Sequence, residues 1–449
     1  MFIPNSDADR EEMLRTIGIK KLDDLFADVP DHLKYPVLNI PDGKTEMEAI
    51  QDVKDLAAVN DSLDELVSFL GAGAYHHYIP AAVDAIISRG EFLTAYTPYQ
   101  PEVSQGTLQA VFEYQSLVAA LTGMEISNAS HYDGATAAAE ACVLAYHHFR
   151  GKKSKFVLSA NLNPQYRETI RTYFLGTDKI KIVGDETQCG PQDPNELLAL
   201  IDSSTALVYI QYPDFFGCIR DYTEFAKEVH ARGALLAISV NPIALGLLKP
   251  PGEFDADIVT GEGQPLGIPL SFGGPYLGLF AAKKEFVRKL AGRIVGETVD
   301  KDGKKGYVLT LTAREQHIRR ERATSNICTN QGLIALASTI YMSLLGKNGL
   351  QQVAKLCYDK AHYAAEQINN IPGFEVVACG DFFNEFIVHC PIPVEELNEK
   401  LLEHDVLGGY DLSADYDEMN NHLLVAVTEL NTKEEIDFFV ETLKEVTND

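Results

Sequence analysis

The chain has 449 residues, 46% hydrophobic and 9% aromatic, which is enough for roughly two or three domains and a large core. Its 38 lysines and arginines face 65 aspartates and glutamates, a formal net charge of −27 that argues against binding to nucleic acid or to an anionic membrane. The longest apolar runs are strand length, and the N-terminus has neither a basic start nor an apolar signal core. We therefore expect a cytoplasmic chain without a membrane span.

Residues 1–65 are predicted to form a helical arm. Asp7 or Asp9 can cap a first helix that ends near Ile17. A second helix is indicated by Thr45, which is followed three residues later by Glu48 and then by an apolar-periodic stretch. Two interpretations are open for this arm. It wraps a partner subunit, or it is a pair of surface helices docked on its own chain.

Residues 66–330 alternate between short apolar runs and longer amphipathic ones. The predicted helices are Thr107–Leu121, Ala135–Phe149, Pro164–Phe174, Pro194–Ile201 and Tyr222–Arg232, and the predicted strands are Lys155–Ser159, Ile180–Gly184, Ala206–Gln211 and Leu235–Val240. Such alternation indicates βαβ crossovers and a mostly parallel sheet with both faces covered. We predict an α/β large domain over this range.

Residues 331–449 are predicted to form a connecting helix and a smaller α+β domain. The pattern favours helices over Cys328–Leu345, Val353–Ile368 and Val394–Glu403, strands near Phe374–Ala378 and Glu385–His389, and a last strand–helix pair.

Seven cysteines are scattered along the chain without a C-x-x-C pair. This pattern favours reduced thiols over a disulfide framework or a zinc site. The adjacent pairs His76–His77 and His147–His148 are poor metal ligands, because neighbouring residues do not share a helix face. We predict no metal site.

The loop Asp257–Gly267 lacks a lysine at the point where one would be expected. The alternating region resembles the large domain of a pyridoxal-phosphate (PLP) enzyme, and this Gly-rich loop is where such an enzyme places the lysine that anchors the cofactor. No lysine occurs between Lys249 and Lys283. A PLP-type domain without its anchor suggests half of an active site that another chain completes.

Two further positions bear on the cofactor. Asp133–Thr136 opens a helix, where free N–H groups and the helix dipole can hold a phosphate, although a plain helix cap by Asp133 explains the pattern equally well. Asn241 stands where PLP enzymes normally carry an acidic residue against the pyridine nitrogen, and an amide cannot supply that charge-stabilised proton. Both observations lean toward a vestigial site.

Two dense polar segments are candidates for chemistry. Thr94–Glu102 gathers Tyr96, Tyr99, Gln100 and Glu102 in a proline-stiffened loop, where they can orient a small carboxylate and deliver protons. The alternative is a structural proline loop.

The second segment, Arg314–Asn326, is predicted to be a cationic helix that runs into Thr324, Ser325 and Asn326. In fold-type-I PLP dimers such a hydroxyl commonly reaches the phosphate of the neighbouring subunit's cofactor. A solvated charged helix is the alternative.

These segments also carry a family resemblance that covers essentially the whole chain. The chain resembles glycine dehydrogenase (decarboxylating), the P-protein of the glycine cleavage system, and in particular the alpha subunit of its split form. The string Thr97–Gly106 is highly specific for it. The other matching segments are Met1–Arg10 with Met13-Leu14, Asn128–Thr136, Phe272–Gly278 and Arg322–Gln331.

The resemblance implies a fold-type-I PLP-transferase-like large domain and a PLP-bearing beta subunit, assembled as α2β2. It implies decarboxylation of glycine and transfer of the aminomethyl group to the lipoyl arm of H-protein. PLP is then expected on the beta subunit, with Thr324, Ser325 and Asn326 reaching its phosphate. The alternatives are a self-sufficient PLP lyase or aminotransferase that uses Lys249 or Lys283, and a scaffold without catalysis.

Overall fold

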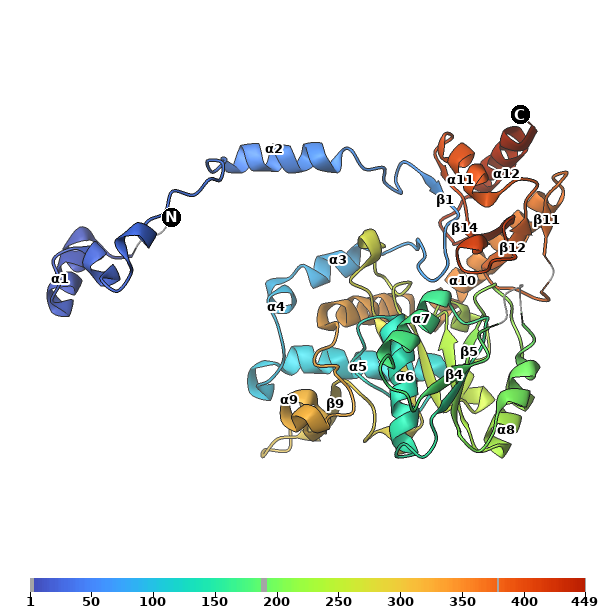
Figure 1. The fold of residues 1–449 in the computed structure, drawn as a ribbon, viewed down its shortest axis with the longest axis horizontal. Coiled ribbons are helices and arrows are strands. Elements are labelled where there is room, and N and C mark those ends of the chain that lie inside the picture. The colour runs from blue at the N-terminus through green and yellow to red at the C-terminus, as the bar shows by residue number, and fades with distance from the viewer. Residues whose placement is uncertain (1–3, 187–191, 378, 449) are drawn as a thin grey trace. The chain divides into compact units, whose positions relative to one another are not determined.

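The computed structural model describes residues 4–186, 192–377 and 379–448. The chain divides into two compact units, residues 1–61 and residues 62–449. Figure 1 shows the elements in chain order.

Over residues 4–61, the first unit consists of two α-helices, two short 3-10 helices and turns, and none of these helical residues is buried. Helix α1 (Asp7–Ile17) is capped by Ser6 rather than by Asp7 or Asp9, because the Ser6 hydroxyl accepts from the Asp9 backbone N–H while the Asp9 carboxylate accepts from Ser6. Helix α2 (Glu46–Ala57) has the predicted reciprocal cap between Thr45 and Glu48. Apolar side chains stay exposed along both helices, including Ile17 and Leu56.

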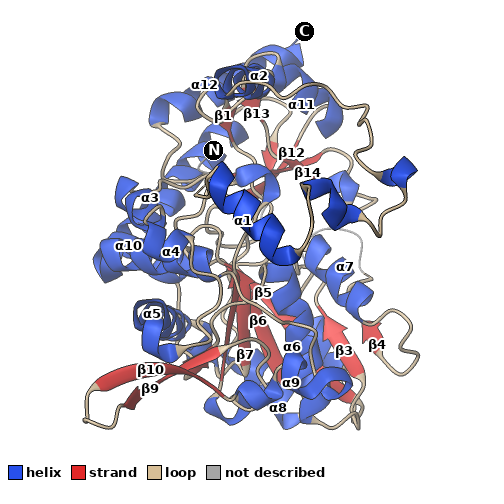
Figure 2. Ribbon diagram, turned by 90° about the vertical axis from the view of Figure 1, so that its left-hand side faces the viewer, coloured by secondary structure: helices blue, strands red, loops and turns tan. Residues whose placement is uncertain are grey.

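A seven-stranded sheet lies at the centre of the second unit, in the order β2-β8-β7-β6-β5-β3-β4. Its strands are β2 (Ile126–Ser127), β3 (Lys155–Leu158), β4 (Lys181–Val183), β5 (Thr205–Tyr212), β6 (Leu235–Val240), β7 (Ile258–Glu262) and β8 (Gly278–Ala282). Neighbouring strands from β4 to β7 run parallel, and β8 runs antiparallel to both β7 and β2. The predicted mostly parallel α/β sheet is confirmed (Figure 2).

Helices cover both faces of this sheet (Figure 2). They are α3 (Ala81–Ile87), α5 (Gln105–Thr122), α6 (Gly134–His148), α7 (Pro164–Tyr173), α8 (Thr223–Ala231) and the long α10 (Gly332–Asn369), with the single-turn α4 (Gly90–Leu93) before the Tyr96 loop. Alternate residues of β5 separate into two cores: Val208 and Ile210 belong to the core that contains α5 and α10 residues, and Leu207 and Tyr209 to the core that contains α6 and α7 residues.

A smaller four-stranded antiparallel sheet follows, in the order β11-β12-β15-β14. It comprises β11 (Glu375–Val376), β12 (Glu385–His389), β14 (Tyr410–Asp411) and β15 (His422–Ala426), accompanied by α11 (Val394–Leu402) and α12 (Lys433–Asn448). A separate parallel pair joins β1 (Val67–Ser68) to β13 (Val406–Leu407). Residues just after the first unit are therefore hydrogen-bonded to the C-terminal part of the chain.

Several elements differ from the sequence prediction. Pro194–Leu200 is a 3-10 helix, and the two predicted helices after residue 328 form one element, α10, which is broken at Gly346 by a left-handed φ of 57°. The predicted strand near Phe374 reduces to β11, and Ala378 lies outside the described residues. The antiparallel hairpin β9 (Ile294–Val299) and β10 (Lys305–Thr310) was not predicted.

Helix α10 is long and apolar enough to cross a membrane by length and composition alone. Half of its most apolar window is buried in the fold, against elements such as α5 and α3. The core of the protein therefore accounts for its hydropathy.

The expectation that all cysteines are reduced thiols is wrong for one pair. Cys218 and Cys379 form a disulfide, with their Cα atoms 5.9 Å apart. The loop after β5 and the loop before β12 meet there through a bridge between Cys218 and Phe382 and a bond from the Ile219 N–H to the Asp381 carbonyl. The two cysteines are 161 residues apart in sequence, so only the packing of the two sheets could reveal the pairing.

Candidate functional site

The carboxyl ends of the parallel strands open into a cavity of about 540 Å³. Asn163 follows β3, Glu262 ends β7, and Asp133 precedes α6, and all three line this cavity. A smaller recess beside it is lined by Gln211 and Asn241, which end or follow β5 and β6. Ligands of parallel α/β sheets bind at this edge, because the loops that connect strand to helix converge there.

Carboxylates satisfy the first turn of α6. The Asp133 side chain accepts from the Thr136 backbone N–H at 2.7 Å, which confirms the plain cap. Glu262 approaches from β7, and its Oε2 accepts from the Gly134 N–H at 2.8 Å. Its Oε1 accepts from the N–H groups of Gln264 and Leu277, both at 2.9 Å. Burial raises the pKa of Glu262 to about 8, although these three donors favour the ionised form.

The Tyr166 side chain of α7 also packs against the first turn of α6. A Cβ atom added at Gly134 would lie 2.3 Å from the Tyr166 hydroxyl oxygen, so this hydroxyl sits directly against the start of α6. Any side chain at residue 134 would displace it. The phosphate position that helix N-termini offer in this kind of fold is therefore filled by groups of the chain itself.

The residues of this cavity do not fit PLP. The segment Asp257–Gly267, predicted as a loop, includes strand β7 and contains no lysine, and the two lysines nearest in sequence have other partners. The Lys249 ammonium donates to the Thr223 hydroxyl at 2.9 Å, and the Lys283 ammonium pairs with Asp257 at 2.8 Å. A carboxylate at the start of α6 would also repel a phosphate.

The Tyr96–Glu102 loop lies elsewhere and is largely exposed. The side chains of Tyr96 and Tyr99 are 85% and 63% exposed, and Gln100 and Glu102 are also exposed. Tyr96 lines a small cavity of about 40 Å³ together with Arg293, whose guanidinium lies over the Tyr99 ring at 5.9 Å from its centroid. An arginine face against a tyrosine ring is a favourable contact that also orients the ring.

Thr324 and Ser325 line a third cavity, of about 190 Å³, whereas Asn326 is exposed. The Ser325 hydroxyl donates to Glu140 Oε1 at 2.8 Å. Burial raises the pKa of Glu140 to about 7, and this hydrogen bond partly opposes the rise. Arg288 and Arg319 line the same cavity, which gives it a cationic wall.

The predicted cationic helix at Arg314–Asn326 is mostly not helical. It contains only one helical turn, α9 (Gln316–Arg319), between two 3-10 turns. The reason is that the Arg314 guanidinium donates to the carbonyls of Leu290 and Gly292, which holds this segment against another loop instead of along a helix axis.

The predicted site residues thus form two groups, the Tyr96–Glu102 loop and Thr324–Asn326, and the segment Ala291–Val295 contributes to the cavities of both. Arg293 and Val295 line the Tyr96 cavity, whereas Ala291 and Gly292 line the Ser325 cavity. Neither the Tyr96 loop nor Thr324–Asn326 is among the residues that line the 540 Å³ cavity.

Sequence reasoning missed Arg293, Tyr166 and the role of Glu262. The signal for Glu262 was available, since it is one of two acidic residues, with Asp257, in the lysine-free segment.

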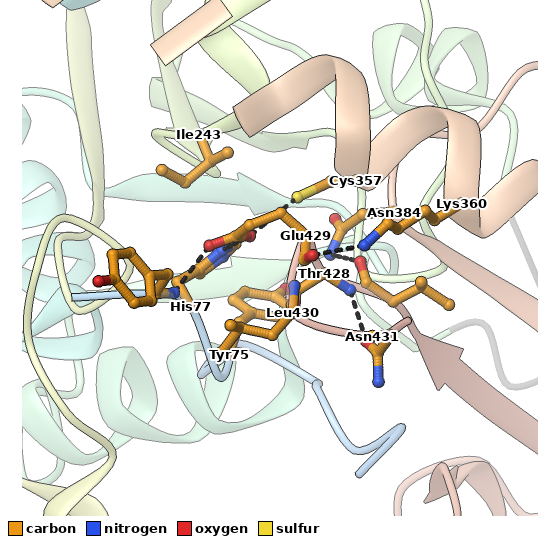
Figure 3. A network of polar contacts seen from close by, with 12 residues as sticks. Tyr75, His77, Ile243, Cys357, Lys360, Asn384, Thr428, Glu429, Leu430 and Asn431 are labelled. Carbon is orange, nitrogen blue, oxygen red and sulfur yellow. Dashed lines mark hydrogen bonds and ion pairs between the residues drawn. The ribbon is translucent and has the colours of Figure 1, made fainter. Parts of the chain in front are cut away.

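A buried polar network ties three distant segments together (Figure 3). His77 Nδ1 and Glu429 Oε2 are 2.6 Å apart, and the Cys357 thiol of α10 donates to the same oxygen at 3.4 Å. The Tyr78 N–H donates to Glu429 Oε1 at 2.7 Å. Burial raises the pKa of Glu429, but the bonds from His77 and Tyr78 outweigh it, and the net shift is downward. The side-chain atoms of His77, Cys357 and Glu429 that could bind a metal ion lie within 4.8 Å of one another. The direct bonds among these three side chains account for this short spacing.

Comparisons with known proteins agree over the whole chain. The family model described as glycine cleavage system P-protein matches residues 1–443. A probable glycine dehydrogenase (decarboxylating) subunit 1 of Thermomicrobium roseum is 51% identical over 447 residues, which is 100% of both chains. One of Bacillus mycoides is 49% identical over 440 residues, which is 98% of each.

A crystal structure of glycine decarboxylase (P-protein) of the glycine cleavage system, in inhibitor-bound form, matches with a TM-score of 0.89 at 41% identity, over 99% of this chain and 100% of that chain. The Burkholderia pseudomallei sphingosine-1-phosphate lyase shares the fold alone, with a TM-score of 0.66 at 14% identity over 94% of both chains. Together with the sheet order described above, these likenesses confirm the fold-type-I PLP-transferase architecture. The chain belongs to the glycine cleavage system P-protein family, alongside its glycine dehydrogenase (decarboxylating) subunit 1 members.

Proposed function

We propose that this chain is the subunit of glycine decarboxylase that does not anchor PLP. It acts in the cytoplasm with a PLP-bearing beta subunit, as α2β2, to decarboxylate glycine and pass the aminomethyl group to the lipoyl arm of H-protein. Glycine dehydrogenases of this family use PLP, which supplies the electron sink for the reaction when it is bound. One observation carries the division of labour. The cofactor position of this chain is filled by Glu262 and contains no lysine.

In this proposal the Tyr96–Glu102 loop contributes to the shared cavity. Tyr96 and Tyr99 offer hydroxyl groups and Glu102 a carboxylate, and all three side chains are exposed on this chain and thus accessible to a partner. Such groups orient a small carboxylate and move protons at the reacting atoms. The Arg293 guanidinium beside Tyr99 holds the ring and adds a positive charge for an anionic substrate.

Thr324, Ser325 and Asn326 are proposed to reach the phosphate of the partner's cofactor. The cationic wall with Arg288 and Arg319 supports this role, because it favours an anion nearby. Thr324 is the better candidate of the two hydroxyls, since Ser325 already donates to Glu140.

The test is reconstitution. The purified chain alone, incubated with PLP and reduced with borohydride, should carry no lysine adduct and should show no exchange of bicarbonate with the carboxyl group of glycine. Mixed with the partner subunit and H-protein, it should restore exchange. An adduct at Lys249 or Lys283 together with activity would favour a self-sufficient PLP enzyme instead. If the partner subunit and H-protein reach the full exchange rate without this chain, the chain is a scaffold without catalysis.

A further inference from the structure

The cavity at the start of α6 has the volume of a small-molecule site but an unusual charge. At about 540 Å³ it falls within the range of ligand pockets. Two carboxylates, Asp133 and Glu262, line it, and among its lining residues, all within the described ranges, there is no lysine, arginine or histidine. An anionic ligand would find no countercharge here.

The backbone N–H groups that would attract an anion at the start of α6 already have acceptors. The Gly134 N–H donates to the Glu262 side chain, and the Thr136 N–H donates to the Asp133 side chain. These bonds make the electrostatic potential at the start of the helix less positive. The amino end of a helix usually offers positive potential, whereas here it presents two acidic side chains to the cavity.

Unused acceptors and aromatic walls complete the cavity. Asp133 Oδ1 holds Thr136, and its Oδ2 has no hydrogen-bond partner within the described part of the chain. The Tyr166 hydroxyl likewise has none there. Tyr132 and Tyr276 also line the cavity. Carboxylates combined with tyrosine faces are the groups that recognise organic ammonium ions.

We propose that this cavity binds a primary ammonium group, in the recess where related folds hold an anionic cofactor. Asp133 supplies the countercharge through its free Oδ2, the Tyr166 hydroxyl accepts one N–H, and the tyrosine rings face the methylene carbons. The ammonium group comes from a free small amine, such as glycine, or from a lysine side chain of another chain. The site goes beyond the proposed function, because it belongs to this chain whether or not the chain shares in catalysis.

Direct binding to the full-length chain is the first experiment. Saturation-transfer NMR on methylammonium chloride, at an ionic strength held constant with sodium chloride, should show saturable binding, and glycine should compete for it. Inorganic phosphate and PLP should neither bind this cavity nor displace methylammonium. Absence of saturable methylammonium binding, or its displacement by phosphate, overturns the proposal.

Matched variants locate the site. Asp133→Asn keeps the helix cap and should fold. Glu262→Gln keeps only one acceptor oxygen for the three backbone N–H groups that the carboxylate holds, so its folding is checked by circular dichroism before binding is measured. Asp133→Asn should weaken methylammonium binding about tenfold or more through loss of a charge-assisted bond, and a folded Glu262→Gln variant should weaken it less. Tyr166→Phe, which keeps the ring, should weaken it a few-fold. Exposed carboxylates provide the controls: Asp84→Asn and Glu113→Gln should bind as the unaltered chain does. Binding by the folded Asp133→Asn variant that equals binding by the unaltered chain overturns the assignment.

The assembled enzyme separates the two sources of the ammonium. If a free amine is the ligand, methylammonium should bind the complex with the partner as it binds the isolated chain. If a partner's lysine fills the cavity, binding should disappear on assembly, and a zero-length carbodiimide cross-link should join Asp133 or Glu262 to that lysine. Loss of binding without such a cross-link contradicts an ammonium site in the assembled enzyme.

Discussion

The start of α6 and the Tyr96–Glu102 loop differ in the burial and hydrogen bonding of their polar side chains. At α6, Glu262 accepts three backbone N–H groups and is 8% exposed. In the loop, Tyr96 is 85% exposed, and its hydroxyl has no hydrogen-bond partner within the described residues. The position that resembles a cofactor site is thus closed by the chain, and the segment that resembles a catalytic loop is left open. Changes in buried polar groups should therefore affect stability, and changes in the loop should affect the reaction.

The buried network in Figure 3 should give the largest effect on stability. His77→Leu removes the ring that pairs with a Glu429 carboxylate whose side chain is 8% exposed and leaves it only the Tyr78 N–H and the Cys357 thiol. Breaking such a buried pair should cost about 3–5 kcal/mol of unfolding free energy. Urea unfolding of the full chain measures it. The double variant His77→Leu/Glu429→Leu should recover much of this loss, because no charge is then left unpaired. If the single variant loses less than about 1 kcal/mol of unfolding free energy, the buried polar groups do not control stability as the comparison with the loop requires.

A second buried carboxyl should make stability depend on pH. Burial raises the pKa of Glu385 from its ordinary 4.5 to about 7, although the Tyr75 hydroxyl and the Ala72 N–H both donate to it. The folded state then holds the proton more tightly than the unfolded state, so this contribution is full below about pH 4.5 and is lost as pH rises through 7.

Glu385→Gln mimics the neutral carboxyl and should flatten the loss of stability between about pH 5 and pH 8 by up to about 3 kcal/mol. Unfolding curves at several pH values in that range provide the measurement. Burial also raises the pKa of Asp214 and Glu140 to about 7 and that of Glu262 to about 8, so these carboxyls should leave a remaining slope in the variant. An unchanged slope would show that Glu385 titrates as it does in the unfolded chain.

The exposed loop should show the reverse behaviour. Tyr96→Phe and Tyr99→Phe should lower glycine–bicarbonate exchange by the reconstituted enzyme about 10–100-fold, because each removes one positioned hydroxyl. Their unfolding free energies should stay within about 0.5 kcal/mol of the original. Tyr78→Phe is a matched control, since Tyr78 is 60% exposed and lies outside the loop. Normal exchange in both loop variants would make the loop structural.

The hydroxyls at Thr324 and Ser325 should differ from each other in what their removal changes. Ser325→Ala removes the bond that opposes the rise of the Glu140 pKa, so this pKa should rise further and the chain should lose about 1 kcal/mol above pH 7. Thr324→Ala should leave stability unchanged and weaken PLP retention by the reconstituted enzyme. The proposed phosphate contact fails if the Thr324→Ala variant retains PLP as tightly as the unaltered enzyme does.

Local patterns along the sequence were sufficient for much of this molecule. Short apolar runs such as Leu235–Val240 predicted buried parallel strands, because a strand covered on both faces must be apolar throughout. The cap at Thr45 followed from spacing alone, whereas the cap by Asp133 was one of two interpretations that the sequence left open. The absence of a lysine from Asp257–Gly267 needed no structure either, since it is a fact of composition.

Tertiary structure decided what depends on contacts between distant segments. Glu262 reaches Gly134 across 128 residues, Cys218 meets Cys379 across 161, and His77 meets Glu429 across 352. The cationic segment after Arg314 looked helical by sequence, but its arginine found carbonyl partners in another loop. Sequence periodicity reports which face of an element is apolar. It carries no information about which distant element will supply the partner of a polar group, because the packing of the whole chain determines that choice.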